Sequence, residues 1–318
     1  MTIASIDIGS NTVLLLIAEY NTQGKNIKPL ANYYESPRIS EGLKIGDKLS
    51  KSKIDLLITV LSLYKEQIIR FNCDKVLITA TNTFRIISNS DEVIYEIEKL
   101  FDWKIKIVSG DEEARLTFLG SIFPFQINSL NNVIDIGGGS TEFVHGNHSS
   151  ILFKKSFNIG VVSLTEKYFS SYPPKENERI NAVEYSKKIF SELLGNYSGN
   201  FDTIAVAGTP TTLSCIKQNI RTYDESRVEN FILQLSDIEL IISELVKLNK
   251  YQVLERFGEV VRGREDVLLA GCLILVSLMK QININQVRVS TKGLRYGVVV
   301  DYLIKNNLLN PEIDYTYN

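Results

Sequence analysis

The sequence predicts an α/β protein made of two similarly built domains. Its 318 residues suit two domains of ordinary size. Segments rich in β-formers alternate with segments of helical periodicity, which favours mixed sheets covered by helices. The tetrapeptide Ile-Asp-Ile-Gly occurs twice, around Asp7 and Asp135, and the two aspartates lie 135 − 7 = 128 positions apart. Because this separation is about one domain of chain, we interpret the repeat as a duplication.

The first half of the chain is predicted to begin with three strands and to continue with alternating helices and strands. Residues 3–8 and 13–20 are rich in aliphatic side chains and flank the turn-like stretch GSNT. Residues 50–71 carry apolar side chains at helical spacing and predict a long helix. The other expected elements are strands at 28–35, 75–79 and 104–108, a helix at 91–101, and a helix in SGDEEARLTFLG.

The second half repeats this order. The run VLLAGCLILVSLM, residues 267–279, is too short to span a bilayer and predicts a buried core helix. Two successive β-β-β-α-β-α-β-α units predict a pair of RNase H-like domains. The expected elements are strands at 133–136, 141–145, 149–157, 202–207 and 285–289, and helices at 161–168, 176–194 and 294–306.

The composition limits the kinds of partner and compartment expected for this protein. The hydrophobic fraction is 44%, the charged fraction 23% and the formal net charge −2, so no basic field is expected to recruit nucleic acid or an anionic membrane. The scattered cysteines Cys73, Cys215 and Cys272 lack metal-site spacing and fit a reducing compartment. No signal-peptide pattern occurs at the N-terminus. We therefore expect a cytoplasmic protein.

The two repeated turns carry the residue types that bind phosphate and a hard cation. Backbone amides in turns rich in Gly, Ser and Thr converge on anions, and carboxylates hold hydrated Mg²⁺. The alternative is a pair of ordinary hairpin turns, and the repetition of Asp-Ile-Gly a domain apart disfavours it. The predicted hydroxyl donors are Ser10, Thr12, Ser140 and Thr141, and the predicted Mg²⁺ ligands are Asp7, Asp135 and Glu142.

The stretch SGDEEARLTFLG predicts a helix that begins with acidic residues. Ser109 and Glu112 have capping-box spacing, which makes Glu112 a structural residue. Glu113 lies in the first turn, where a carboxylate interacts favourably with the helix dipole. It could also be a general base at the start of a helix.

Other motifs are weaker when taken singly. Arg85 ends ATNTFR, which is expected to be a polar turn, and it could form two hydrogen bonds with a phosphate, or a surface salt bridge. AVAGTPTTLSC places Gly208 and Thr209 before a helix with Pro210 at its first position, where an anion could bind. His145 and His148 lie in a polar hairpin, which predicts a solvated turn. The chain lacks the glycine-rich signatures of Walker and Rossmann nucleotide loops.

Seven stretches, taken in order, resemble the exopolyphosphatase/guanosine pentaphosphate phosphatase family of the actin/hexokinase/heat-shock-protein-70 ATPase superfamily. They are SIDIGSNTVLLLI, ATNTFR, SGDEEARLTFLG, VIDIGGGSTEF, AVAGTPTTL, REDVLLAG and STKGLRYG. The resemblance implies an actin-like fold with phosphate bound in an inter-domain cleft. It implies a first domain of residues 1–120 completed by a returning helix at 294–318, and a second domain of residues 121–293.

The resemblance also implies roles for individual residues. Glu113 matches the base that activates water, and Arg85 matches an arginine at the phosphate. The metal ligands would be Asp7, Asp135 and Glu142. The phosphate-binding residues would be Ser10, Asn11, Thr12, Gly137, Gly138, Gly139, Ser140, Thr141, Gly208 and Thr209.

The expected activity is that of a Mg²⁺-dependent phosphohydrolase. Its substrate would be inorganic polyphosphate or, as the alternative, guanosine pentaphosphate, and a homodimer is one expected assembly. The turn at Gly208 has one glycine where nucleotide-binding relatives have two, which disfavours a sugar kinase or ATPase. A non-catalytic sensor is a third hypothesis. Cations that could follow a polyphosphate chain are Arg262, Arg264, Lys292 and Arg295.

Overall fold

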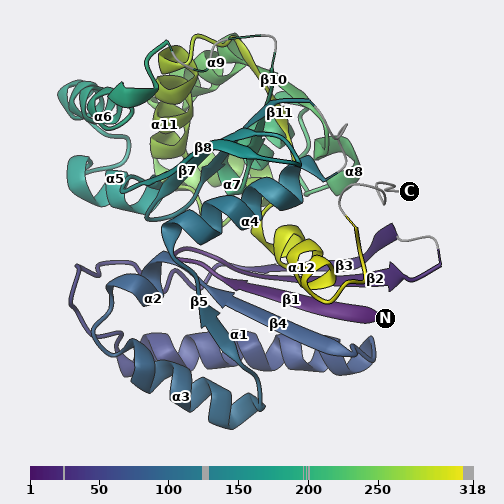
Figure 1. Cartoon of the computed structure of the whole chain (residues 1–318). Coiled ribbons are helices and arrows are strands. Elements are labelled where there is room, and N and C mark those ends of the chain that lie inside the picture. The colour runs from purple at the N-terminus through teal and green to yellow at the C-terminus, as the bar shows by residue number, and fades with distance from the viewer. Residues whose placement is uncertain (24–25, 124–128, 196, 198, 200, 311–318) are drawn as a thin grey trace. The chain divides into compact units, whose positions relative to one another are not determined.

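The computed structural model describes residues 1–23, 26–123, 129–195, 197, 199 and 201–310. The chain divides into two compact units (Figure 1). Unit 1 contains the described residues of Met1–Asn128, His148–Ser150 and Lys292–Asn318, and unit 2 contains Ser129–Asn147 and Ile151–Thr291. The units divide at 128/129 and 291/292, whereas the predicted boundaries are 120/121 and 293/294. Residues 311–318 of the predicted C-terminal segment lie outside the described residues.

Unit 1 is built on a five-stranded mixed sheet with the order β3-β2-β1-β4-β5. Its central strand β1 pairs antiparallel with β2 and parallel with β4. This places Asp7 opposite Leu14 on one side and Thr79 on the other. The strands are β1 (Thr2–Ile8), β2 (Val13–Asn21), β3 (Asn26–Glu35), β4 (Lys75–Ala80) and β5 (Ile105–Ile107).

Helices cover both faces of this sheet, with α1 and α3 on one face and α4 and α12 on the other (Figure 1). Alternation along β1 explains the split, since Ala4 and Ile6 pack in the core on the α1 side, whereas Ile3 packs with α12. By the same alternation, Asp7 faces the α4 and α12 side. The helices are α1 (Lys51–Arg70), α2 (Asn82–Ile86), α3 (Ser90–Phe101), α4 (Gly110–Ile122) and α12 (Leu294–Lys305).

Unit 2 repeats the sheet with one added strand, in the order β10-β11-β9-β6-β7-β8. Its strand β6 takes the place of β1, because it pairs antiparallel with the strand that follows it and parallel with β9. Asp135 lies opposite Glu142 on β7 and Val206 on β9. The strands are β6 (Asn131–Ile136), β7 (Thr141–Gly146), β8 (Ile151–Phe157), β9 (Asp202–Val206), β10 (Ile232–Gln234) and β11 (Gln286–Val289).

One large apolar core holds the helices of unit 2 against its sheet. The segment predicted as a core helix is α11, and its residues are almost all buried. The helices are α5 (Val161–Tyr168), α6 (Glu176–Ile189), α7 (Gly208–Lys217), α8 (Glu225–Val228), α9 (Leu235–Leu245), α10 (Lys250–Phe257) and α11 (Leu268–Gln281), with short 3₁₀ turns at Ser191–Leu193 and Gly258–Val261.

The predicted α/β class and the two similar domains of actin-like type are confirmed by this architecture. Three local predictions are wrong. The stretch ATNTFR forms the short helix α2 rather than a turn, and α7 begins at Gly208, which places Pro210 at its third position. His145 is buried in β7, where its Nδ1 pairs with Asn132 Oδ1 at 2.8 Å, so it does not lie in a solvated turn. In the described part of the chain, no helix is long and apolar enough to cross a membrane.

Candidate active site

The two repeated turns have the same backbone geometry. In unit 1 the Gly9 amide donates to the Thr12 carbonyl at 2.9 Å, and in unit 2 the Gly137 amide donates to the Ser140 carbonyl at 2.9 Å. Each turn leaves the carboxyl end of a central strand, two residues after an aspartate. The exposed carboxyl end of a strand is where α/β proteins place ligands.

In the second turn, the helix that follows fixes the direction of the peptide groups. The carbonyls of Gly137 and Gly138 accept hydrogen bonds from the Val161 and Val162 amides of α5, at 2.9 and 2.8 Å. Because a trans peptide directs its C=O and N–H to opposite sides, the amides of Gly138 and the residue after it point away from α5. Amides aligned in this way form a nest for an anion.

The first turn is fixed in the same way by a different segment. The Ser10 carbonyl accepts from the Ser40 amide at 3.2 Å, and the Asn11 carbonyl accepts from the Arg38 amide at 3.1 Å. The amides of Asn11 and Thr12 therefore point away from residues 38–40. Both turns thus present N–H groups on the side opposite to the segment that holds them.

A hydroxyl contact joins the first turn to α2. The Thr83 hydroxyl donates to Ser10 Oγ at 3.1 Å, and both side chains are buried. The Thr81 amide, at the start of α2, also donates to the Ile8 carbonyl of β1 at 3.2 Å. These contacts hold the helix that carries Arg85 against the end of the central strand.

Arg85 and Glu113 form a half-buried ion pair. Arg85 Nη1 donates to Glu113 Oε2 at 2.6 Å and to the Val108 carbonyl at 2.9 Å. The exposed fractions of the two side chains are 21% and 12%. Burial raises the pKa of the Glu113 carboxyl above its ordinary value, although the positive charge of Arg85 opposes this rise. A carboxyl with a raised pKa is a stronger base, as proton abstraction requires.

Glu112, next to Glu113, has a different environment. The Ser109 hydroxyl accepts from the Glu112 amide at 3.2 Å, so the predicted helix cap is present. The Glu112 carboxylate does not complete a capping box, because it binds the guanidinium of Arg115 at 2.8 and 3.0 Å. Hydrogen bonding to Arg115 lowers the pKa of Glu112 to about 2. The two neighbouring glutamates are therefore shifted in opposite directions, as expected for one base and one structural residue.

In unit 2, Asp135 and Glu142 are cross-strand neighbours that share one face of the sheet. Glu142 is buried, and its Oε1 accepts from the Ser156 hydroxyl at 2.6 Å. Two adjacent carboxylates repel each other unless a cation or a donor compensates them, and an all-oxygen donor set is what Mg²⁺ prefers. Within the described residues, no three His, Cys, Asp or Glu side chains gather as a complete metal site. The donor chemistry of this pair fits a Mg²⁺ ion whose other ligands are water and substrate.

The start of α7 adds a second feature to unit 2. Ala207 has φ = 72°, a conformation that costs a residue with a side chain roughly 1–3 kcal/mol. The guanidinium of Arg264 lies directly against the Cα of Gly208, where any added Cβ would collide with it. Thr209 is buried and packs against Gly271 of α11. Strain, a helix N-terminus and a guanidinium therefore coincide at the predicted phosphate turn.

Two of the cations expected to follow a polyphosphate chain already bind protein groups. Arg262 forms a two-pronged ion pair with Glu259, and both residues are exposed. Arg295 Nη1 donates to Asn32 Oδ1 at 3.1 Å, on β3 of unit 1. Of this set, Arg264 is the one that the structure places at a predicted phosphate-binding turn.

The predicted site residues thus form two sets, one in each unit. The set in unit 1 comprises Asp7, Ser10, Asn11, Thr12, Arg85 and Glu113, and the set in unit 2 comprises Asp135, Gly137, Gly138, Gly139, Ser140, Thr141, Glu142, Gly208 and Thr209. The hydrogen bond from Thr83 to Ser10 was not predicted from the sequence, although ATNTFR contains this threonine. It also left the position of Arg264 undecided.

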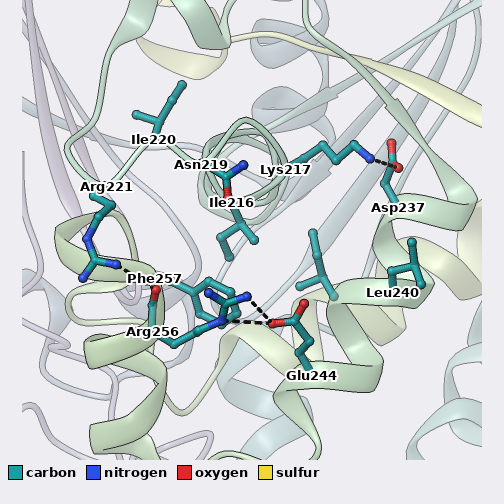
Figure 2. Close-up of a pocket in the computed structure, with 11 residues that line it drawn as sticks. Ile216, Lys217, Asn219, Ile220, Arg221, Asp237, Leu240, Glu244, Arg256 and Phe257 are labelled. Atoms are coloured by element: carbon teal, nitrogen blue, oxygen red, sulfur yellow. Dashed lines mark hydrogen bonds and ion pairs between the residues drawn. The ribbon is translucent and has the colours of Figure 1, made fainter.

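Figure 2 shows a separate hollow of about 290 Å³ in unit 2, formed by the end of α7 with α9 and α10. Its lining includes the buried apolar side chains of Ile220 and Phe257. Ion pairs among its lining residues join Lys217 to Asp237 and Arg256 to Glu244 (Figure 2). None of the predicted site residues that the structure describes lines this hollow.

The two sheets and their equivalent strand-end turns define a protein with the actin-like ATPase fold. A crystal structure of the Aquifex aeolicus member of the Ppx/GppA family is 28% identical, with a TM-score of 0.80 over 96% of this chain and 99% of that chain. The model of the Ppx/GppA phosphatase family matches residues 16–306. The chain belongs to this family.

Curated relatives carry several names. A bifunctional 3-dehydroquinate synthase/phosphatase of Fusobacterium nucleatum is 33% identical over 94% of this chain. A guanosine-5'-triphosphate,3'-diphosphate pyrophosphatase of Pseudoalteromonas translucida is 28% identical over 94%. A Haemophilus influenzae protein with a provisional exopolyphosphatase name is 27% identical over 96% of this chain and 92% of its own length. The chain spans 46% and 59% of the length of the first two relatives.

Proposed function

We propose that this protein is a phosphohydrolase that releases the terminal phosphate from a phosphoanhydride chain. The observation that carries the proposal is the half-buried pair of Arg85 and Glu113 at the start of α4, beside the first phosphate-type turn. Membership of the Ppx/GppA phosphatase family supports the same reaction class.

In the proposed reaction, Glu113 removes a proton from a water molecule. The water oxygen then bonds to the terminal phosphorus, and the bond from phosphorus to the bridging oxygen breaks. The shortened chain leaves with the electron pair of that bond. Such transfers depend mostly on positioning and on stabilising the charge of the phosphoryl oxygens. Burial of Glu113 supports its role, because a carboxyl with a raised pKa accepts a proton more readily.

In unit 1, the amides of the first turn, the Ser10 hydroxyl and Arg85 would bind phosphoryl oxygens. In unit 2, the amides of the second turn and the Ser140 hydroxyl would do so. We include Mg²⁺ in the proposal, held by Asp135 and Glu142 with Asp7 as a further candidate. The ion would neutralise negative charge on the substrate. The paired, all-oxygen donor set of unit 2 supports this assignment.

Inorganic polyphosphate is the substrate that we favour, and guanosine pentaphosphate is the alternative. Both end in a phosphoanhydride, so the groups that perform the chemistry do not distinguish them, and relatives carry names of both kinds. Arg264 at the Gly208 turn supports binding of an additional phosphate. The engagement of Arg262 and Arg295 with protein groups argues against a long basic track, which favours short or medium chains.

The test is phosphate release from polyphosphates of defined length and from guanosine pentaphosphate, each with Mg²⁺ and with excess chelator. We expect Mg²⁺-dependent release, with kcat/KM highest on short or medium polyphosphate. A preference of tenfold or more for the nucleotide, about 1.4 kcal/mol, would reverse the choice of substrate. If no substrate releases phosphate, the proposal of a phosphohydrolase is refuted. If the rates stay full in chelator, only the proposed role of Mg²⁺ is refuted.

A further inference from the structure

The C-terminal helix α12 lies against α4, the helix that carries Glu113 (Figure 1). The two helices meet backbone to backbone, because Gly120 of α4 faces Gly293 and Gly297. A Cβ added to Gly120 would lie only 2.5 Å from the Gly297 amide nitrogen. Next to this point, the Ser121 hydroxyl donates to the Lys292 carbonyl at 2.8 Å. Since no side chain separates the helices here, the contact cannot adjust by a change of rotamer.

The backbone contact covers the stretch of α4 from Leu116, whose carbonyl a Cβ on Gly297 would meet, to Gly120. Gly120 and Glu113 are seven residues apart, which corresponds to about 10 Å along a helix. A tilt of about 5° around Gly120 would therefore move Glu113 by roughly 0.9 Å. A misplacement of about 1 Å can lower a catalysed rate by up to about 100-fold. A second contact nearer the N-terminus of α4 would oppose such a tilt more strongly than this stretch alone.

Asp301 of α12 supplies that second contact. Its Oδ1 accepts from Arg115 Nη2 at 2.7 Å, and its carboxylate is only 15% exposed. The same guanidinium binds both carboxylate oxygens of Glu112, the residue before Glu113, at 2.8 and 3.0 Å. Hydrogen bonds therefore connect α12, through Arg115, to the first turn of α4.

The position of this turn matters because the partner of Glu113 belongs to another element. Arg85 is on α2, and it reaches Glu113 Oε2 at 2.6 Å while also binding the Val108 carbonyl. A tilt of α4 would move Glu113 but not Arg85, which belongs to α2. The contact between the two side chains would therefore lengthen. We propose that Asp301 is a positioning residue for the catalytic base. This inference rests on the proposed function.

The first experiment compares Asp301→Asn with wild type, using Asp55→Asn as the matched control. Asp55 forms an exposed ion pair with Lys51 on α1, at 3.1 Å. We expect kcat to fall about tenfold in Asp301→Asn with KM within about twofold, and both to stay at wild-type values in the control. A lower melting temperature with unchanged kcat would show a purely structural role and overturn the proposal.

A double-mutant cycle tests the route of the effect. Arg115→Met should lower kcat by at least as much as Asp301→Asn, and the double variant should be no slower than Arg115→Met alone. Multiplicative losses would mean that Asp301 does not act through Arg115. Retention of at least half of the wild-type kcat in Asp301→Glu would support positioning by charge, and a complete loss there would contradict it.

A further readout does not depend on turnover. The pKa of Glu113 can be followed by carboxyl NMR in the folded protein. Arg85, on α2, is the charged side chain in contact with Glu113 among the described residues, and it lowers this pKa. Loosening that contact in Asp301→Asn should therefore raise the pKa, and an unchanged value would refute positioning. If the wild type releases no phosphate, the proposed function fails, while this titration still tests the link from Asp301 to Glu113.

Discussion

Replacing Gly120 with alanine should force α12 away from α4. The new Cβ would lie 2.5 Å from the Gly297 amide nitrogen and 3.1 Å from the Gly297 Cα, whereas ordinary contacts begin near 3.4 Å. The obstacle is backbone, so α12 must move by roughly 1 Å. That movement would strain the bond from Ser121 to the Lys292 carbonyl and the packing of Leu116 against α12.

The expected loss in the free energy of unfolding follows from two opposing contributions. Overpacking costs typically about 1–3 kcal/mol, and the upper value applies here because the obstacle is backbone, whereas alanine regains roughly 1 kcal/mol of helix propensity over glycine. A net loss of about 2 kcal/mol should lower the melting temperature of unit 1 by roughly 4–8 °C. Gly271→Ala in α11 is the matched variant, because its Cβ would meet the side chain of Thr209, at 2.7 Å from Cγ2, rather than backbone. The obstacle there is a short, buried side chain rather than the backbone of a neighbouring helix, so this loss should be smaller than in Gly120→Ala.

The assay is thermal unfolding followed by circular dichroism, with phosphate release measured on the folded fraction. Because Gly120 lies on the helix that carries Glu113, we expect kcat to fall in Gly120→Ala as well. A melting temperature within about 2 °C of wild type, or a larger loss in Gly271→Ala, would refute the argument from backbone contact.

The remaining predictions concern chemistry and pH. Glu113→Gln should lower kcat by roughly two to four decades without loss of folding, and turnover assays on Glu112→Gln, which only weakens the bond to Arg115, should show a loss of no more than about tenfold. The pKa of Glu112 is about 2 in the fold against 4.5 ordinarily, so its stabilisation is present above pH 4.5 and is lost as the pH falls towards 2. Urea unfolding of wild type and Glu112→Gln should therefore converge in acid. Asp135→Asn should raise the Mg²⁺ concentration for half-maximal rate, and equal Mg²⁺ curves would exclude Asp135 as a ligand. Burial lowers the pKa of His145, so its unfolded form binds a proton more readily, and stability should fall as the pH drops below about 6.5. A pH scan of unfolding in which His145→Phe keeps the same slope would contradict this.

Local sequence determined the repeated sheets and the turns that end their central strands. Ile-Asp-Ile-Gly encodes a buried strand followed at once by a residue that permits a sharp turn, and both features depend on neighbours within a few positions. The predicted elements around Asp7 and Asp135 therefore match strands and turns of the structure. The core helix near the C-terminus was predictable for the same reason, since an apolar run of that length must be buried.

Local rules failed where a side chain found a distant partner. Polar neighbours in VHGNHSS predicted exposure, but His145 is enclosed by the aromatic rings of Tyr197 and Phe201 and bound by Asn132. Capping-box spacing predicted that Glu112 would bind the start of its own helix. Arg115, itself held by α12, offers a charge-assisted and two-pronged bond, which is stronger than a single bond to a backbone amide.

The sequence by itself thus determined which residue types stand at the ends of the strands, and the tertiary structure decided which of them act together. Arg85 and Glu113 are 28 positions apart and lie on separate helices. Arg115 and Asp301 are 186 positions apart. Their pairing depends on the packing of α4 and α12 on one face of a sheet, where glycines allow the two backbones to touch. Ion pairs of this kind depend on distances of a few ångströms in space, and periodicity along the chain carries no information about them.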